Sequence, residues 1–199
     1  MIAIIDYGAG NLRSVQKALD YVGAQSRVVS SPAQAGDADR IILPGVGAFG
    51  AAAARLQETG FFEYVREWLQ KERPFLGICL GMQLLMQGSA ESAGVEGLGL
   101  FEGGCERFTA GKVPQIGWNQ VAIGKKSKLF EKIGDESFFY FLHGYYVAPE
   151  KAGAVAATTT YGVTYPSVLE KGNIRAVQFH PEKSGRCGLV MLKNWVTSC

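Results

Sequence analysis

Histidine is scarce in this 199-residue sequence, which contains only His143 and His180. The four cysteines form no Cys-x-x-Cys pair and have no histidine-rich spacing around them. A zinc site or a disulfide framework would need one of these patterns. We therefore expect reduced thiols and no bound metal. The four cysteines are Cys79, Cys105, Cys187 and Cys199.

The sequence also lacks an excess of charge. Lys and Arg total 20 against 18 for Asp and Glu, a net charge of +2, whereas nucleic-acid-binding domains carry clustered basic residues. No apolar run approaches the roughly 20 residues of a transmembrane helix. The segment Met1–Asp6 has no basic leader of the kind that opens a secretory signal. We expect a cytoplasmic protein that binds neither nucleic acid nor membrane.

Two glycine-rich turns fall short of the nucleotide-binding fingerprints. Gly8-Ala9-Gly10 lacks the third glycine of a dinucleotide site, and Pro44-Gly45-Val46-Gly47 lacks the Gly-Lys-Ser/Thr ending of a phosphate loop. We therefore expect no nucleotide cofactor, and no cofactor of another kind. The second turn follows a strand and can offer a backbone N–H to a developing oxyanion, although an ordinary glycine-rich loop has the same composition.

The sequence does contain enough apolar residues for one packed domain spanning residues 1–199. Hydrophobic residues make up 47% of the chain and charged residues 19%, which argues against extensive disorder. Short apolar runs alternate with helical patterns in the first half. Strands are expected at 2–5, 27–29, 40–43 and 75–78, and helices at 12–22, 61–71 and 80–87.

After about residue 98 the pattern changes to strand-like segments with few helices between them. Strands are expected at 138–142, 154–160 and 174–179, and a last amphipathic helix at 188–196. The fold class is thus α/β, with a largely parallel central sheet flanked by helices and an additional β-rich C-terminal half. Functional residues are expected at the carboxyl ends of the parallel strands.

Gly77-x-Cys79-x-Gly81 has the spacing of a nucleophile elbow. In such an elbow, flanking glycines let a strand turn sharply into a helix and project the central side chain. The N-terminus of the following helix would favour a thiolate, and the amide of Leu80 could donate to an oxyanion. A buried cysteine between two helix-packing glycines would have the same sequence, so the assignment needs a partner base.

His180 is the better of the two possible bases. It follows the apolar strand 175–179, and Glu182 comes two residues later, on the same side of an extended chain. Cys79, His180 and Glu182 would then be the nucleophile, base and orienting group of a triad. A capped histidine beside a solvated glutamate is the structural alternative. His143 has no acidic neighbour in sequence and fits a substrate contact or a core position better.

Together these segments resemble the class I (triad) glutamine amidotransferases, which have a glycine-rich oxyanion strand, a Gly-x-Cys-x-Gly elbow and a late His-Pro-Glu. All three occur here in that order. Within the class, the sequence is most similar to the family of glutaminase subunits of imidazole glycerol phosphate synthase. The resemblance covers nearly the whole chain and is carried by Asp6–Asn11, Pro44–Phe49, Gly77–Gln83, Pro114–Asn119 and Gln178–Ser184.

The resemblance implies that Cys79 attacks the side-chain amide of glutamine, that His180 shuttles the proton and that Glu182 orients His180. A thioester forms and is hydrolysed to glutamate, and ammonia is the useful product. The amide of Val46, after a backbone rearrangement, would join that of Leu80 in the oxyanion hole.

A further set of residues is implied to surround the bound glutamine. Glu91 would hold the substrate ammonium, although a solvated glutamate at a helix end is the alternative. The family usually reads His-Ser-Tyr-Tyr where this chain has His143-Gly144-Tyr145-Tyr146, so a serine side-chain contact is absent. The implied glutamine-binding residues are Gly47, Gln83, Glu91, His143, Gly144 and Tyr145.

The resemblance also implies a heterodimer with a separate (β/α)₈-barrel cyclase subunit of histidine biosynthesis. The cyclase uses the ammonia to turn a phosphoribulosyl formimino aminoimidazole carboxamide ribonucleotide into imidazole glycerol phosphate and an aminoimidazole carboxamide ribonucleotide. Each matching interface position also has a structural interpretation, as a helix cap, a core aromatic or a solvated charge. These positions are Asn11, Trp118, Tyr140 and Lys183.

Two other functions remain compatible with the sequence. A triad glutaminase could serve a different synthase, and it would then be stimulated by that synthase and not by the cyclase. A catalytically silent subunit could keep the fold for regulation and form no thioester. The intact set of Cys79, His180 and Glu182 argues against the silent subunit.

Overall fold

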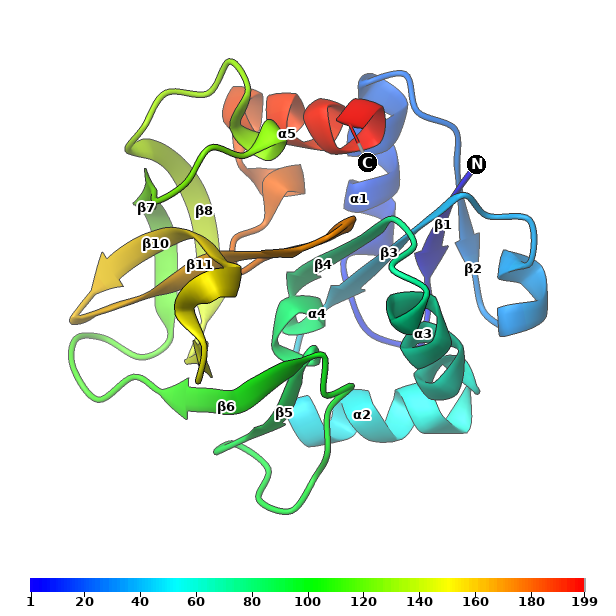
Figure 1. The fold of residues 1–199 in the computed structure, drawn as a ribbon, viewed down its shortest axis with the longest axis horizontal. Coiled ribbons are helices and arrows are strands. Elements are labelled where there is room, and N and C mark those ends of the chain that lie inside the picture. Colours follow the sequence, from blue (N-terminus) through cyan, green and yellow to red (C-terminus); the bar gives the residue numbers. More distant parts are fainter. Residues whose placement is uncertain (199) are drawn as a thin grey trace.

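The computed structural model describes residues 1–198, and Figure 1 shows their arrangement. The helices are α1 (Leu12–Tyr21), α2 (Phe49–Glu58), α3 (Phe61–Gln70), α4 (Leu80–Gln83) and α5 (Gly185–Ser198). The strands are β1 (Ile2–Ile5), β2 (Ser26–Val29), β3 (Arg40–Gly45), β4 (Phe75–Cys79), β5 (Met86–Ser89), β6 (Phe101–Arg107), β7 (Gln115–Ile123), β8 (Ser137–His143), β9 (Tyr145–Pro149), β10 (Val155–Tyr161), β11 (Val163–Lys171) and β12 (Ile174–Val177). The short 3₁₀ helices are η1 (Pro32–Ala35), η2 (Lys128–Phe130), η3 (Ala152–Ala154) and η4 (Pro181–Lys183).

A nine-stranded sheet forms the centre of the molecule, in the order β2-β1-β3-β4-β12-β11-β10-β7-β8. The first five strands in this order run parallel, and the other four pair antiparallel. A smaller sheet has the order β5-β6-β9. The predicted α/β fold, with its largely parallel sheet and β-rich C-terminal half, is confirmed. Among residues 1–198, no helix is both long and apolar enough to cross a membrane.

Alternate residues of the parallel strands enter two different cores. Ile2 and Ile4 belong to the core that includes residues of α1 and α5, whereas Ala3 and Ile5 belong to the core that includes residues of α2 and α3. Figure 1 shows these two pairs of helices on opposite sides of the sheet. Successive side chains of a strand point to opposite faces. Because both faces are covered, β1 must be apolar at every position, which is why it reads as a continuous hydrophobic run.

The helix predicted for residues 80–87 is wrong beyond Gln83. There α4 ends, and Met86–Ser89 is strand β5, which pairs in parallel with β6. Leu84, Leu85 and Met86 are all buried. A short run buried on every side has no periodicity that separates helix from strand. The last helix also begins earlier than predicted, at Gly185.

The sharpest turn of the main sheet joins β4 to α4 at Cys79. The φ of Cys79 is 56°, in a region that residues with a Cβ rarely adopt. A Cβ added at Gly77 would lie 2.8 Å from the carbonyl oxygen of Gly81, and one added at Gly81 would overlap the carbonyl oxygen of Leu43 on β3. Both glycines are therefore required by the close approach of α4 to the strands beneath it.

Replacing Gly81 by alanine should destabilise the fold, because the carbonyl of Leu43 would have to move and disturb the pairing of β3 with β4. We expect the free energy of unfolding, measured by urea denaturation, to fall by on the order of 3 kcal/mol. Gly153→Ala is the matched control, because a Cβ there meets nothing within 4 Å, and its midpoint should stay unchanged. Equal midpoints for the two variants would contradict this steric account.

Candidate active site

Strands β3, β4 and β12 end side by side. Gly45 of β3 pairs with Cys79 of β4, and Val177 of β12 pairs with Ile78. His180 follows Val177 by three residues. The carboxyl ends of neighbouring parallel strands lie at one edge of the sheet, where α/β proteins place their functional groups. The glycine-rich turn, the cysteine and the histidine are thereby brought together from distant parts of the chain.

His180 and Glu182 form a buried pair. Nδ1 of His180 lies 2.9 Å from Oε1 of Glu182, and the two side chains are only 2% and 1% exposed. Burial lowers the pKa of His180, but its interactions with Cys79 and with Glu182 outweigh burial and raise the pKa to about 10. Because Glu182 accepts the Nδ1 proton, Nε2 is the ring nitrogen that is left to interact with Cys79.

The thiol of Cys79 lies at the start of α4 and is only 4% exposed. Its sulfur lies 3.7 Å from the carbonyl oxygen of Leu142, to which the thiol donates, and 3.7 Å from the side-chain Nε2 of Gln178, which donates to the sulfur. A helix N-terminus and a hydrogen-bond donor both favour a negative charge on sulfur. The local surroundings of Cys79 therefore suit a nucleophile.

A cavity of about 210 Å³ opens above the thiol. Leu142 is the only member of its lining that the sequence did not suggest. A cavity of this size suits one small polar substrate, such as an amino acid, better than a large cofactor. The lining residues are Val46, Gly47, Cys79, Leu80, Gln83, Glu91, Leu142, His143, Gly144 and Tyr145.

Glu91 has a structural role as well as a place in this cavity. Its Oε2 accepts from the backbone N–H of Phe49 at 2.7 Å, and the hydroxyl of the next residue, Ser92, accepts from the N–H of Gly50 at 3.0 Å. These N–H groups open α2 and would otherwise lack partners. The interpretation of Glu91 as a solvated glutamate at a helix end is therefore wrong, because it caps a distant helix.

His143 is buried in the wall of the cavity. Its Nδ1 lies 2.8 Å from the carbonyl oxygen of Tyr145, and its Nε2 lies 3.3 Å from the hydroxyl of Tyr165. Burial is the largest influence on its pKa, which falls to about 4. The ring is thus neutral near pH 7, with the proton on Nδ1, because a carbonyl oxygen can only accept. A serine at the adjacent Gly144 would fit, since a Cβ there meets Val113 at an ordinary 3.5 Å.

The four proposed partner-facing residues lie outside the cavity. Trp118 and Tyr140 are cross-strand neighbours on β7 and β8, with ring centroids 6.2 Å apart, and Nζ of Lys183 lies 5.8 Å from the Tyr140 ring centroid. Trp118 is 56% exposed, so its interpretation as a core aromatic is wrong. Asn11 occupies the N-cap position of α1, but its side chain makes no capping hydrogen bond.

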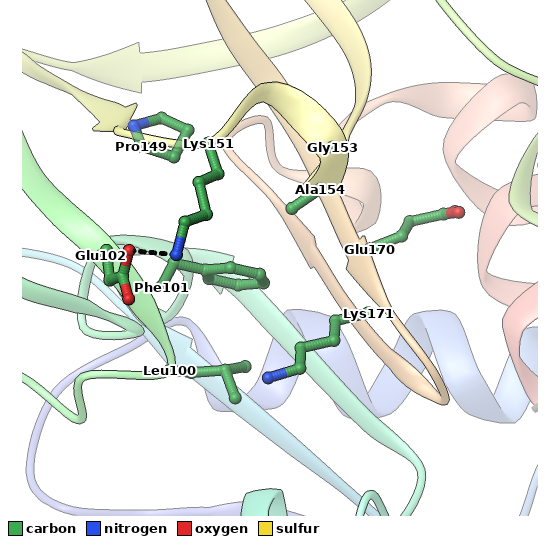
Figure 2. Close-up of a pocket in the computed structure, with 9 residues that line it drawn as sticks. All are labelled: Leu100, Phe101, Glu102, Pro149, Lys151, Gly153, Ala154, Glu170 and Lys171. Atoms are coloured by element: carbon green, nitrogen blue, oxygen red, sulfur yellow. Dashed lines mark ion pairs between the residues drawn. The ribbon is translucent and has the colours of Figure 1, made fainter.

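A second cavity, of about 380 Å³, shares no lining residue with the cavity above the thiol, and Figure 2 shows its lining. Leu100, Phe101 and Ala154 form its apolar surface, and Lys151 at its rim is already paired with Glu102. Its lining contains no cysteine or histidine. The smaller cavity, which contains both, is therefore the better candidate for an active site.

Within residues 1–198, no group of three or more His, Cys, Asp or Glu side chains could hold a metal ion. Cys79, Cys105 and Cys187 are free, and Cys199 lies outside the described residues. Burial raises the pKa of the Cys105 thiol to about 12, which leaves it an unreactive neutral thiol.

The chain combines an elbow cysteine, a buried His–Glu pair and a small cavity on this sheet, which is the arrangement expected of a class I glutamine amidotransferase. The model of the family "Glutamine amidotransferase class-I" matches residues 3–199. The chain is 50% identical over 198 residues to imidazole glycerol phosphate synthase subunit HisH of Chlorobaculum tepidum, with 98% of each chain covered. It is also 50% identical over 197 residues to the same subunit of Methanothermobacter thermautotrophicus, again with 98% of each covered. The chain belongs to the class I glutamine amidotransferases and, within them, to the HisH family.

Solved structures show the same fold at lower sequence identity. The structure of PurLQS from Thermotoga maritima has a TM-score of 0.79 at 20% identity, covering 98% of this chain and 97% of the other. A crystal structure of a glutamine amidotransferase has a TM-score of 0.74, also at 20% identity, covering 98% and 100%. At these identities the likeness concerns the fold alone.

The lowered pKa of His143 predicts a loss of stability in weak acid. The unfolded chain binds a proton near pH 6.5, whereas folded His143 does so only near 4, so acid favours unfolding in this window. His180 has the opposite sign: its contribution is present below about pH 6.5 and is lost as the pH rises toward 10.

Urea unfolding of the parent and of His143→Gln at about pH 7.5 and about pH 5 measures this effect. The parent should lose about 2 kcal/mol more than the variant between the two conditions. Equal losses would show that His143 is not the group responsible.

Proposed function

We propose that the chain is the glutaminase subunit of an imidazole glycerol phosphate synthase and that it makes ammonia from glutamine at Cys79. The position of the Cys79 thiol, between the His180–Glu182 pair and a cavity of amino-acid size, is the observation that carries this proposal. Glutamate and ammonia are the products, and a partner subunit consumes the ammonia. No cofactor or metal is needed for this chemistry.

The proposed reaction begins from the ion pair in which Nε2 of His180 already holds the proton of the Cys79 thiol, in keeping with the raised pKa of His180. The thiolate attacks the side-chain carbonyl carbon of glutamine, and the amide of Leu80 donates to the oxyanion. The amide of Val46 joins it after the glycine-rich turn has rearranged. Protonated His180 then gives the proton to the leaving nitrogen, which departs as ammonia and leaves a thioester.

The second half of the reaction releases glutamate. His180 takes a proton from water, and the resulting hydroxide attacks the thioester carbon. The intermediate collapses with Cys79 leaving as the thiolate beside protonated His180, and the product carboxyl group loses its proton to solvent as glutamate. Glu182 keeps its hydrogen bond to Nδ1 throughout and holds the imidazole in one orientation.

The cavity also offers groups that could hold the ends of glutamine. Glu91 supplies a carboxylate for the ammonium group, held in place by the N-terminus of α2. The amide nitrogen of Gln83 donates to the carbonyl of Tyr145 at 2.9 Å, and the amide oxygen of Gln83 remains available as an acceptor. Gly47, His143 and Gly144 complete the remaining wall.

The proposed partner is a (β/α)₈-barrel cyclase, and the exposed face of β7 and β8 is the proposed docking surface. Ile116, Trp118 and Phe138 are all more than half exposed, although they are large and apolar. Together with Tyr140 they lie on one face, because Trp118 pairs with Tyr140 and residues two apart share a face. Such a contiguous apolar surface indicates a protein partner.

A network of three hydrogen bonds connects this surface to the proposed base. The backbone N–H of His180 donates to the carbonyl of Tyr140 at 2.8 Å. The hydroxyl of Ser184 accepts from the N–H of Tyr140 at 2.9 Å and donates to the carbonyl of His180 at 2.6 Å. A partner that contacts the ring of Tyr140 can therefore shift the backbone that carries His180, which supports glutaminase activity that depends on the partner.

The decisive assay mixes the chain with the cyclase and its ribonucleotide and follows glutamate release. We expect slow hydrolysis by the chain alone and strong stimulation in the complete mixture.

Cys79→Ala and His180→Ala should abolish turnover, because they remove the nucleophile and the base. His143→Ala should raise KM more than it lowers kcat. Stimulation by a different synthase, with none from the cyclase, would favour the alternative of a triad glutaminase for another acceptor.

Truncating Trp118 to alanine should weaken cyclase binding by about 2 kcal/mol, as expected for an exposed aromatic anchor at the centre of an interface. Isothermal titration calorimetry measures the change. Tyr21→Ala is the control, because Tyr21 is 78% exposed but lies at the end of α1, away from this face. Equal losses of affinity in both variants would place the interface elsewhere.

A further inference from the structure

Gln178 is a completely buried polar residue that the reaction outlined above does not use. It lies between β12 and His180, and its backbone N–H donates to the carbonyl of Ser167 at 2.9 Å. Its side chain reaches across the site, so that Nε2 lies 3.7 Å from the sulfur of Cys79. An amide is costly to bury unless its donors and acceptors are used.

A backbone carbonyl fixes which end of the Gln178 amide faces the sulfur. The carbonyl oxygen of Tyr145 can only accept, so the group of Gln83 that lies 2.9 Å from it must be the NH₂. The same NH₂ lies 3.2 Å from Gln178 and therefore meets the amide oxygen of that side chain. The NH₂ of Gln178 is left to face Cys79.

We propose that Gln178 is a further catalytic residue, whose side-chain N–H donates to the sulfur of Cys79, favours the thiolate and holds it in one direction. This inference rests on the proposed role of Cys79 as the nucleophile. A donor binds an anionic acceptor more strongly than a neutral one, and burial of Gln178 and Cys79 from water strengthens the difference.

Leu142 and Gln178, two hydrogen-bond partners of the sulfur, favour opposite protonation states of Cys79. The carbonyl of Leu142 can only accept, so it favours the protonated thiol, whereas the NH₂ of Gln178 favours the thiolate. The sulfur is anionic twice in the reaction, before it attacks glutamine and again when it leaves the thioester. Gln178 stabilises both states through the same hydrogen bond, and it neither gains nor loses a proton.

The test measures how fast iodoacetamide alkylates Cys79 as a function of pH, with the labelled peptide quantified by mass spectrometry. Gln178→Met removes the donor at similar volume. Gln178→Glu keeps an acceptor for Gln83 but places a carboxylate beside the sulfur. The titratable groups around Cys79 remain unchanged in both variants. These groups are His180 with Glu182 behind it, Tyr7 in the turn after β1, Tyr165 on β11, and His143 and Glu91 in the cavity wall.

We expect the pH midpoint of alkylation to rise by about one unit in Gln178→Met, a roughly tenfold loss of thiolate near neutrality. It should rise further in Gln178→Glu. With the cyclase and its ribonucleotide present, kcat for glutamine should fall by about tenfold while KM changes by less than about twofold. Ser167→Ala is the control. Ser167 is buried and its backbone carbonyl accepts from the backbone N–H of Gln178, but Ser167 makes no hydrogen bond to the sulfur.

Unchanged midpoints in both Gln178 variants would overturn the proposal, as would an equal rise in Ser167→Ala. Lower turnover without a change of midpoint would also overturn it, because that result fits a purely structural amide. Alkylation is measured on the chain alone and needs no partner. A failure of cyclase stimulation in the parent protein would therefore count against the proposed function, and the alkylation rates would still test the role of Gln178.

Discussion

The close approach of α4 to strand β3 is the constraint on which the rest of the site depends. Gly81 lies against the carbonyl oxygen of Leu43, where no side chain fits, and this contact places the start of α4 directly over the ends of β3 and β4. Cys79 is held at a φ of 56° as a result. Strain of this kind persists only where the surrounding structure fixes it. In this conformation the thiol of Cys79 lies at the N-terminus of α4, in the cavity lining and next to His180.

Backbone carbonyls then orient the side chains around the thiol. The carbonyl of Tyr145 accepts from both Gln83 and His143, so it fixes one amide orientation and one imidazole tautomer. The carbonyl of Tyr140 accepts from the backbone of His180. Because Tyr145 begins β9 and Tyr140 lies in β8, the polar site is held in place by the antiparallel half of the molecule, whereas the nucleophile comes from the parallel half.

Much of this arrangement could be predicted from the sequence, for physical reasons. Glycines with a fixed spacing around Cys79 identify a turn, and two histidines leave little choice of base. The role of Glu91 at the start of α2 could not be predicted, because a contact across 42 residues leaves no local pattern. The orientation of Gln178 depends on Gln83 and on a distant carbonyl. The end of α4 could not be predicted either, because Leu84–Met86 is buried on all sides, which removes the periodicity that distinguishes helix from strand.

As the proposed nucleophile, Cys79 must carry the glutamyl group during turnover. The direct measurement is mass spectrometry of the peptide that contains Cys79, after acid quenching of the chain with glutamine, cyclase and ribonucleotide in steady state. We expect a glutamyl adduct on Cys79 that disappears when glutamine is exhausted. Steady glutamate release with no adduct on Cys79, or with an adduct on Cys105 or Cys187 instead, would contradict it.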